Sequence, residues 1–182
     1  LVLLIIKAVQ QDNIWMMISF PIFGVSLILL YLASTLYHAS KEPQKRFKLK
    51  VFDHAAIYVL IAGSYTPFTL VSLNGETGWL IFSMVWVMAF TGIILKLFFT
   101  GKFKIISTAM YVLMGWLIVF YFQDLTASLH EKGVFYLILG GVLYTIGAIL
   151  YSIKKIKFNH AIFHFFVLAG SFCHFLSIYL YV

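Results

Sequence analysis

"IWMMISFPIFGVSLILLYLASTLYHASKEPQKRFKLK", residues 14–50, decides the fold class of this chain. Its first part, residues 14–38, contains no Lys, Arg, Asp or Glu. It is long enough to cross a bilayer, because the hydrocarbon core of about 30 Å requires about 20 apolar residues in a helix. A basic cluster follows, made of Lys41, Lys45, Arg46, Lys48 and Lys50. An apolar run followed by basic residues is typical of an integral membrane protein.

The composition of the whole chain supports this interpretation. Of the 182 residues, 63% are hydrophobic and 10% are charged, whereas a water-soluble domain has about 25% charged residues. The net charge is +7, but the basic residues lie in short clusters between apolar runs, so we expect no nucleic-acid partner and expect membrane lipids instead. The single cysteine, Cys173, lies in an apolar run and excludes an intramolecular disulfide and a CxxC metal site.

The apolar runs predict an all-α integral membrane protein, a bundle of seven transmembrane helices within a single domain over residues 1–182. A short run at residues 1–9 predicts the end of a first helix whose start is missing. A cleaved signal peptide fits this run less well, because it has neither a basic head nor a small-residue cleavage site. The six complete spans are expected at residues 14–38, 51–73, 78–99, 104–122, 133–153 and 160–181.

The charges of the links predict the orientation of the helices. Besides the basic cluster at residues 41–50, Lys residues follow the spans at 78–99 and 133–153, whereas the alternate links are poor in them. Basic links remain in the cytoplasm. We therefore expect the N-terminus inside and the C-terminus outside. The basic residues of these two further links are Lys102, Lys104, Lys154, Lys155 and Lys157.

Polar residues gather at the expected cytoplasmic ends of three spans. Two pairs are four residues apart, and such pairs share one face of a helix. A third pair of neighbours opens the span at 51–73, so three helix ends contribute to one layer of the bundle. The pairs are Ser34 with His38, His160 with His164, and Asp53 with His54.

This layer has the ligand chemistry of a zinc site. Three histidines with an open fourth position are how a catalytic zinc is held, and His38, His160 and His164 supply them. Zinc is favoured over magnesium or calcium because the set is rich in imidazole and poor in carboxylate. Asp53 could orient a water at the metal or take its proton, and Ser34 could hydrogen-bond that water or a substrate carbonyl. The alternative is that Asp53 and the histidines only cap helix ends near the lipid headgroups.

The other histidines point less clearly to a function. His54 projects about 100° away from Asp53 around a helix, which favours packing. His174 lies about 15 Å from His164 toward the outer side, which favours core packing with a hydrogen-bond partner over a proton or substrate path. His130 falls in an outer link and receives no role.

Two groups of small or helix-breaking residues predict structural features. Gly63 and Pro67 lie within about one turn and predict a kink that could shape a cavity above the metal. Gly140, Gly141 and Gly147 predict close helix packing.

Three motifs resemble those of the progestin and adipoQ receptor family, and within it the bacterial hemolysin III branch. They are "STLYH" at 34–38, "FDHAAIYVLIAGSYTPF" at 52–68 and "HAIFHFFVLAGSFCHF" at 160–175. The resemblance covers essentially the whole chain. It implies a seven-helix protein of the bacterial inner membrane with its N-terminus inside.

The resemblance also implies roles for individual residues. It places zinc near the cytoplasmic face, with His38, His160 and His164 as ligands. It makes Asp53 the acidic residue linked to the metal through water, and Ser34 the serine of the motif.

The resemblance implies more than one function. The family is similar in motif to membrane amidases that cleave ceramide, which implies a zinc-dependent hydrolase of an acyl-amide lipid, or a factor in lipid and membrane homeostasis. The bacterial branch is also described as cytolytic and pore-forming. Because the outer halves of the spans at 14–38, 104–122 and 160–181 are apolar, a channel through one bundle is disfavoured, and a pore made by an oligomer stays open. A third alternative is a sensor without catalysis, in which zinc staples two helices together.

Overall fold

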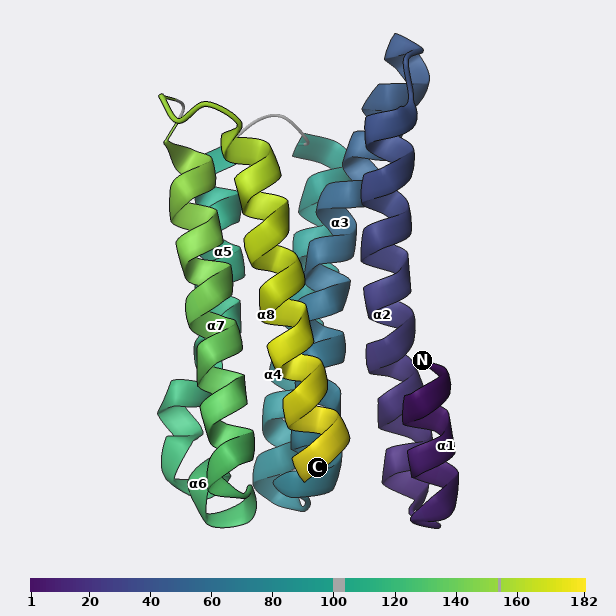
Figure 1. Ribbon diagram of the computed structural model, residues 1–182, viewed down its shortest axis with the longest axis vertical. Coiled ribbons are helices and arrows are strands. Elements are labelled where there is room, and N and C mark those ends of the chain that lie inside the picture. Colours follow the sequence, from purple (N-terminus) through teal and green to yellow (C-terminus); the bar gives the residue numbers. More distant parts are fainter. Residues whose placement is uncertain (100–103, 154) are drawn as a thin grey trace. The chain divides into compact units, whose positions relative to one another are not determined.

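The chain is helical throughout the part that this computed structural model describes, which is residues 1–99, 104–153 and 155–182 (Figure 1). Long helices dominate, and two short irregular helical turns, η1 and η2, interrupt them. In chain order the elements are α1 Val2–Gln10, α2 Ile14–Ala39, α3 Pro43–Pro67, η1 Phe68–Ser72, α4 Glu76–Phe99, α5 Lys104–Gly115, η2 Leu117–Tyr121, α6 Phe122–Ser128, α7 Glu131–Ser152 and α8 Asn159–Tyr181.

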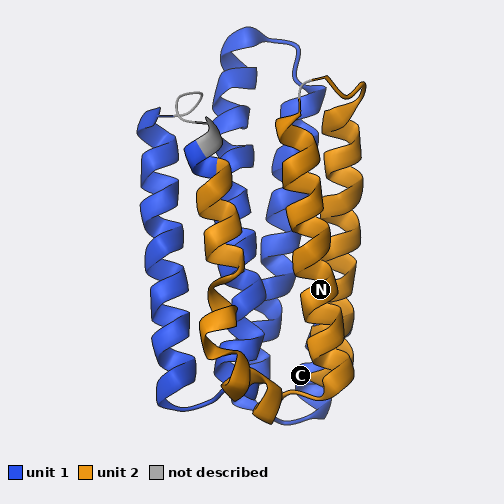
Figure 2. Cartoon of the chain, turned by 90° about the vertical axis from the view of Figure 1, so that its left-hand side faces the viewer, with its two compact units in different colours: residues 1–107 blue, residues 108–182 orange. Residues whose placement is uncertain are grey.

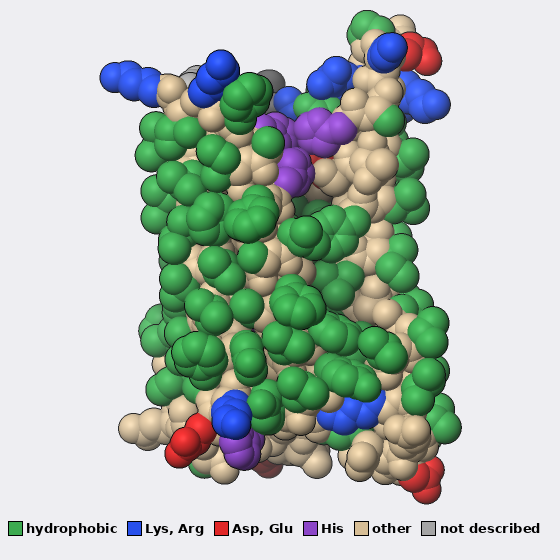
Figure 3. Space-filling model, viewed as in Figure 1, with side chains coloured by type: hydrophobic (Ala, Val, Ile, Leu, Met, Phe, Trp, Pro, Cys, Tyr) green, Lys and Arg blue, Asp and Glu red, His purple; other side chains and the backbone are tan. Residues whose placement is uncertain are grey.

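Six helical stretches of the described chain are long and apolar enough to cross a membrane, which confirms the six complete spans predicted. The stretch Ile106–Ser128 is assembled from α5, η2 and α6, and the others follow α2, α3 with η1, α4, α7 and α8. Hydrophobic side chains cover most of the visible surface, and Lys and Arg side chains lie near the helix ends (Figure 3). The direction in which the helices cross the membrane stays a prediction.

The third span starts earlier than the apolar run suggested. α3 begins at Pro43, with Pro in its first turn, and continues through the basic cluster that was expected to be a link. Lys, Gln and Arg are good helix formers, so these residues extend the helix although they are too polar for the bilayer core. Asp53 and His54 consequently lie nearly three turns inside α3, and not in its first turn as predicted. The expected link at 100–103 and Lys154 lie outside the described residues.

The chain divides into two compact units, Leu1–Ser107 and Thr108–Val182, which are coloured separately in Figure 2. Unit 1 contains α1 to α4 and unit 2 contains α6 to α8 with the end of α5. Each unit is described by itself, and the single domain expected over residues 1–182 stays a prediction.

In unit 1, α2 and α3 form a tightly packed antiparallel pair. A Cβ atom added at Gly63 of α3 would lie 2.4 Å from the Oγ of Ser26 on α2, so only glycine allows this approach. A π-helical turn follows Pro67, at the position where a kink was predicted, and in it the Leu73 N–H donates to the Phe68 carbonyl at 2.8 Å. The indole Nε1 of Trp86 on α4 donates to Thr66 Oγ1 at 3.2 Å, which ties α4 to α3 near this turn.

In unit 2, α7 and α8 are the main pair. A Cβ atom added at Gly140 of α7 would lie 2.2 Å from the Cδ2 of His174 on α8, and one at Gly147 would lie 2.9 Å from the Cβ of Phe166. The Oγ of Ser177 donates to the carbonyl of Gly133 at 2.7 Å. These contacts confirm the close packing predicted from Gly140 and Gly147. At Gly141 an added Cβ atom would lie 3.6 Å from its nearest neighbour, which is an ordinary van der Waals distance.

The neighbouring glycines of α7 give a matched test of this packing. Gly140→Ala is expected to lower the free energy of unfolding by about 1–3 kcal/mol, because its methyl group would overlap the His174 ring. Gly141→Ala is expected to be neutral or stabilising, because alanine favours the helix by about 1 kcal/mol and meets no close atom. Thermal unfolding of both variants in the same detergent measures the difference; equal midpoints for the two would contradict it.

Candidate metal centre

The first half of the candidate site lies in unit 1, where α2 approaches α3. The two helices are joined by a short link at residues 40–42 and therefore run in opposite directions, so the last turns of α2 lie beside the early turns of α3. The hydroxyl of Ser34 on α2 donates a hydrogen bond to the carboxylate of Asp53 on α3. This hydrogen bond agrees with the prediction that the two residues lie in one layer of the bundle, although the bond itself was not predicted.

Asp53 is a buried acidic group, with 9% of its surface exposed, in an apolar span. Its carboxylate Oδ2 also lies 3.7 Å from the Nδ1 of His54. Because Asp53 is nearly three turns from the start of α3 at Pro43, it cannot cap the free N–H groups of that helix end. The capping alternative is therefore wrong for Asp53, whose hydroxyl partner comes from another helix.

His54 is held by its own helix. Its Nδ1 lies 2.7 Å from the carbonyl oxygen of Lys50, and since a carbonyl only accepts, Nδ1 carries the proton and donates. The 3.7 Å contact with Asp53 is then electrostatic and not a second hydrogen bond. This geometry agrees with the packing interpretation of His54.

His38 completes the polar residues of α2. It lies in the last turn of that helix, one turn after Ser34, and its side chain is exposed. Its ring lies 4.8 Å from the ring of Tyr37, and the guanidinium of Arg46 lies 5.3 Å above the Tyr37 ring. The α2 end thus presents an imidazole beside an aromatic and a basic side chain of the same unit.

The second half of the candidate site is the histidine pair in unit 2. His160 and His164 lie in the first two turns of α8, and their rings stack with centroids 4.7 Å apart and planes at 22°. The ring of Tyr151 at the end of α7 packs edge-on against His160, with centroids 5.3 Å apart. The i, i+4 spacing has therefore placed both imidazoles on one face, as predicted.

The turn between α7 and α8 fixes where this pair begins. Phe158 adopts a left-handed conformation with φ of 61°, which is uncommon for a residue with a side chain. The next residue, Asn159, donates from its amide Nδ2 to the carbonyls of Tyr151 at 3.1 Å and Ile153 at 3.4 Å. These bonds tie the first turn of α8 to the last turn of α7.

The donor set suits a metal ion. His38, His160 and His164 each offer one imidazole nitrogen, and together they could hold a metal. Neutral imidazoles suit zinc and other transition metals better than magnesium or calcium.

The remaining histidines have structural surroundings. His174 is buried with 8% exposed, its Nε2 lies 3.3 Å from the carbonyl of Leu137, and the ring of Tyr144 packs edge-on against it, which agrees with core packing. His130, to which no role was given, is the N-cap of α7: its Nδ1 accepts from the Lys132 N–H at 3.2 Å, and its ring stacks on Tyr181.

The sequence analysis did not predict a role for two residues beside the histidine pair. Tyr151 supports the ring of His160, and Asn159 fastens the turn that precedes it. Asn directly before a helical histidine was a usable signal, because Asn is common at helix starts. No comparable signal marked Tyr151, since its contact depends on how α7 meets α8.

The Ser34–Asp53 hydrogen bond can be tested by stability. Ser34→Ala is expected to lower the free energy of unfolding by about 1–3 kcal/mol, because it leaves a buried carboxylate without its hydroxyl donor. Thr35→Ala is the matched control, because the exposed Thr35 hydroxyl bonds only to Tyr31 of its own helix. In a double-mutant cycle, Ser34→Ala should lower the free energy of unfolding less in an Asp53→Leu background than in the wild type. An equal loss of unfolding free energy in both backgrounds would show that Ser34 acts through some other contact.

Comparisons with known proteins agree with the membrane architecture and the motifs. Residues 1–175 match the model of the family described as Haemolysin-III related. The chain is 48% identical over 181 residues to the Hemolysin-3 homolog of Bacillus subtilis (strain 168), covering 100% of this chain and 85% of that protein. It is 43% identical over 182 residues to Hemolysin-3 of Bacillus cereus, covering 100% and 83%. It is 28% identical over 181 residues to the human Monocyte to macrophage differentiation factor, covering 94% of this chain and 74% of that protein.

The described part of the chain has six helices long and apolar enough to span a membrane. This chain is a multi-pass bacterial membrane protein that belongs to the haemolysin-III related family, the hemolysin III branch of the progestin and adipoQ receptor family.

Proposed function

We propose that this protein is a zinc-dependent hydrolase of an acyl-amide lipid, with its site at the cytoplasmic face of the membrane. The observation that carries the proposal is the buried Asp53 carboxylate, which receives a hydrogen bond from Ser34 of a second helix. An ionisable side chain inside an apolar span is costly and is usually kept for function. His38, one turn from Ser34, supplies a metal ligand on the same helix.

The predicted topology supports one metal centre with His38, His160 and His164 as ligands. If successive spans cross the membrane in opposite directions, the end of α2 and the start of α8 open on the same membrane face. Basic residues near both ends favour the cytoplasm for that face. We infer that the three histidines bind one zinc ion there.

Each polar residue has a definite task in amide hydrolysis. Bound zinc would polarise the amide carbonyl and make a water molecule more acidic. Asp53 accepts a proton from the water that attacks the carbonyl carbon. When the C–N bond breaks, Asp53 returns this proton to the leaving amine, so the products are a fatty acid and an amine. Ser34 holds the Asp53 carboxylate in place through its hydroxyl.

The lipid class of the substrate follows from where these residues lie. Asp53 is in a helix that is long and apolar enough to span the membrane, and many large hydrophobic side chains of the described helices are exposed. A substrate whose tail dissolves in the bilayer can approach such a site from the side. We therefore assign a membrane lipid with an amide-linked acyl chain, and not a water-soluble amide.

A sensor without catalysis is the second candidate. It is favoured by the position of the ligands, because His38 is at the end of α2 whereas His160 and His164 are at the start of α8. A metal held by all three would staple these helices and could respond to lipid without cleaving it. A cytolytic pore, which the name Hemolysin-3 of the relatives suggests, would need a polar lining along its whole length, and an oligomer would have to supply it.

Metal content tests the ligand set. The purified wild-type protein is expected to contain about one zinc ion per chain by elemental mass spectrometry. Replacing His160 and His164 together by Ala should lower the content at least tenfold, because one remaining imidazole cannot hold the ion. His130→Ala is the matched control and should retain zinc, since His130 is an N-cap in unit 2. Zinc retained by the double variant would refute the assignment.

Turnover tests catalysis separately. With a fluorescent ceramide-like lipid in mixed micelles, wild-type protein should release fatty acid, and Asp53→Asn should reduce the rate at least 100-fold while zinc content is unchanged, because general base catalysis contributes about 10²–10⁴-fold. If zinc-loaded wild-type protein releases fatty acid no faster than Asp53→Asn does, the result would favour the sensor. Ion leakage from protein-loaded liposomes that survives removal of zinc would favour the pore.

A further inference from the structure

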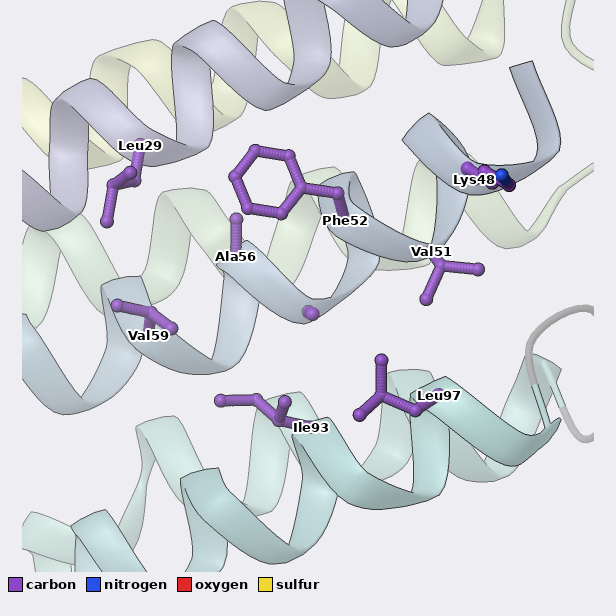
Figure 4. Close-up of a pocket in the computed structure, with 9 residues that line it drawn as sticks. Leu29, Lys48, Val51, Phe52, Ala56, Val59, Ile93 and Leu97 are labelled. Carbon is purple, nitrogen blue, oxygen red and sulfur yellow. The ribbon is translucent and has the colours of Figure 1, made fainter. Parts of the chain in front are cut away.

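A groove on unit 1 lies between α2, α3 and α4 and does not include the candidate metal ligands (Figure 4). Its volume is about 320 Å³. Leu29 from α2, Phe52 and Val59 from α3, and Ile93 and Leu97 from α4 give it an apolar lining. Lys48 is its single charged lining residue.

The groove is open on one side and not a closed core cavity. Phe52 is 43% exposed and Leu97 is 60% exposed, although both line it. Since these side chains belong to helices long and apolar enough to span the membrane, the open side faces a medium that can supply hydrocarbon. A flexible acyl chain could therefore enter the groove from the side.

The length of the groove matches one leaflet of a bilayer. The lining residues of α3 recur along one helical face from Lys48 to Val59, over which an α-helix rises about 16 Å. The hydrocarbon core is about 30 Å thick, so this rise is about half of it. A lipid standing in one leaflet would extend its acyl chain along the face and place its headgroup near Lys48.

The charge at that end selects the kind of headgroup. Figure 4 shows Lys48 at one end of the groove, with Leu29, Val59 and Ile93 toward the other. Lys48 is exposed and belongs to the basic first turns of α3, where Lys45 and Arg46 are also exposed, and the exposed Lys41 lies just before this helix. Glu42 is the only acidic residue among residues 41–50. This surplus of positive charge complements a phosphate group that carries a net negative charge.

From this groove we propose a second lipid site in the protein: one anionic phospholipid binds between α3 and α4, with its phosphate on the Lys48 ammonium and one acyl chain along the apolar lining. Salt-bridge contact with Lys48 selects anionic over zwitterionic headgroups, and the lining holds the chain in place. The site does not depend on zinc or on hydrolysis, because Ser34, His38 and Asp53 do not line it.

Native mass spectrometry of the full chain, released from nanodiscs with equal amounts of phosphatidylglycerol and phosphatidylcholine of the same acyl chains, tests the proposal. Wild-type protein should retain one phosphatidylglycerol at least fivefold more often than phosphatidylcholine. Lys48→Ala should reduce this preference about fivefold, because a basic residue near anionic lipid contributes about that factor. Lys48→Arg should restore the preference, which separates charge from folding.

Two further variants test the location. Lys45→Ala removes an equally exposed charge that does not line the groove, and it should change retention less than twofold. Ala55→Trp fills the groove from α3 without changing charge, and it should abolish retention. Equal retention of both lipids by wild-type protein, or equal losses for Lys45→Ala and Lys48→Ala, would overturn the proposal. Retention that persists in Ala55→Trp would also overturn it, because the acyl chain would then lie elsewhere.

Discussion

The hydrogen bond from Ser34 to Asp53 is the interaction on which the site in unit 1 depends. In an apolar span water is scarce, so a carboxylate is costly unless the protein supplies a hydrogen-bond donor. The Ser34 hydroxyl of α2 supplies that partner, so α2 contacts α3 at this level. Further along the same pair, Gly63 lets α3 approach Ser26 closely, so two contacts on different turns set the same antiparallel alignment. His38 lies one turn beyond Ser34 on the same helix, because the two residues are four apart in the sequence.

Unit 2 prepares its two imidazoles by other means. Gly140 and Gly147 bring α7 and α8 close together, and Asn159 fastens the start of α8 to carbonyls at the end of α7. His160 and His164 then emerge from a helix start that is held in place, with Tyr151 against one ring. An anchored start limits the conformational freedom that metal binding would otherwise remove, which favours tight binding. The Ser34–Asp53 pair is likewise ordered by its hydrogen bond, so each unit presents a prearranged part of the proposed centre.

Hydropathy predicted the six spanning helices because lipid imposes a simple requirement of length and apolarity on each of them. It failed at Pro43, since a basic helical extension is polar like a loop. It also failed at η2, where the span departs from regular α-helix two residues after Gly115, the last residue of α5. The i, i+4 spacing predicted that His160 and His164 share a face. The bond of Asp53 to Ser34, the support of His160 by Tyr151 and the groove beside Lys48 could not be predicted, because each depends on how two or three helices pack.

The central claim is that one zinc ion is bound by the imidazoles of His38, His160 and His164. X-ray absorption at the zinc edge of the purified protein tests it most directly, because imidazole rings give a characteristic outer-shell scattering. The account predicts three imidazole ligands with zinc–nitrogen distances of about 2.0–2.1 Å. It also predicts the loss of one imidazole in His38→Ala, whose α2 belongs to unit 1. A zinc shell without imidazole, or a shell that His38→Ala leaves unchanged, would contradict it.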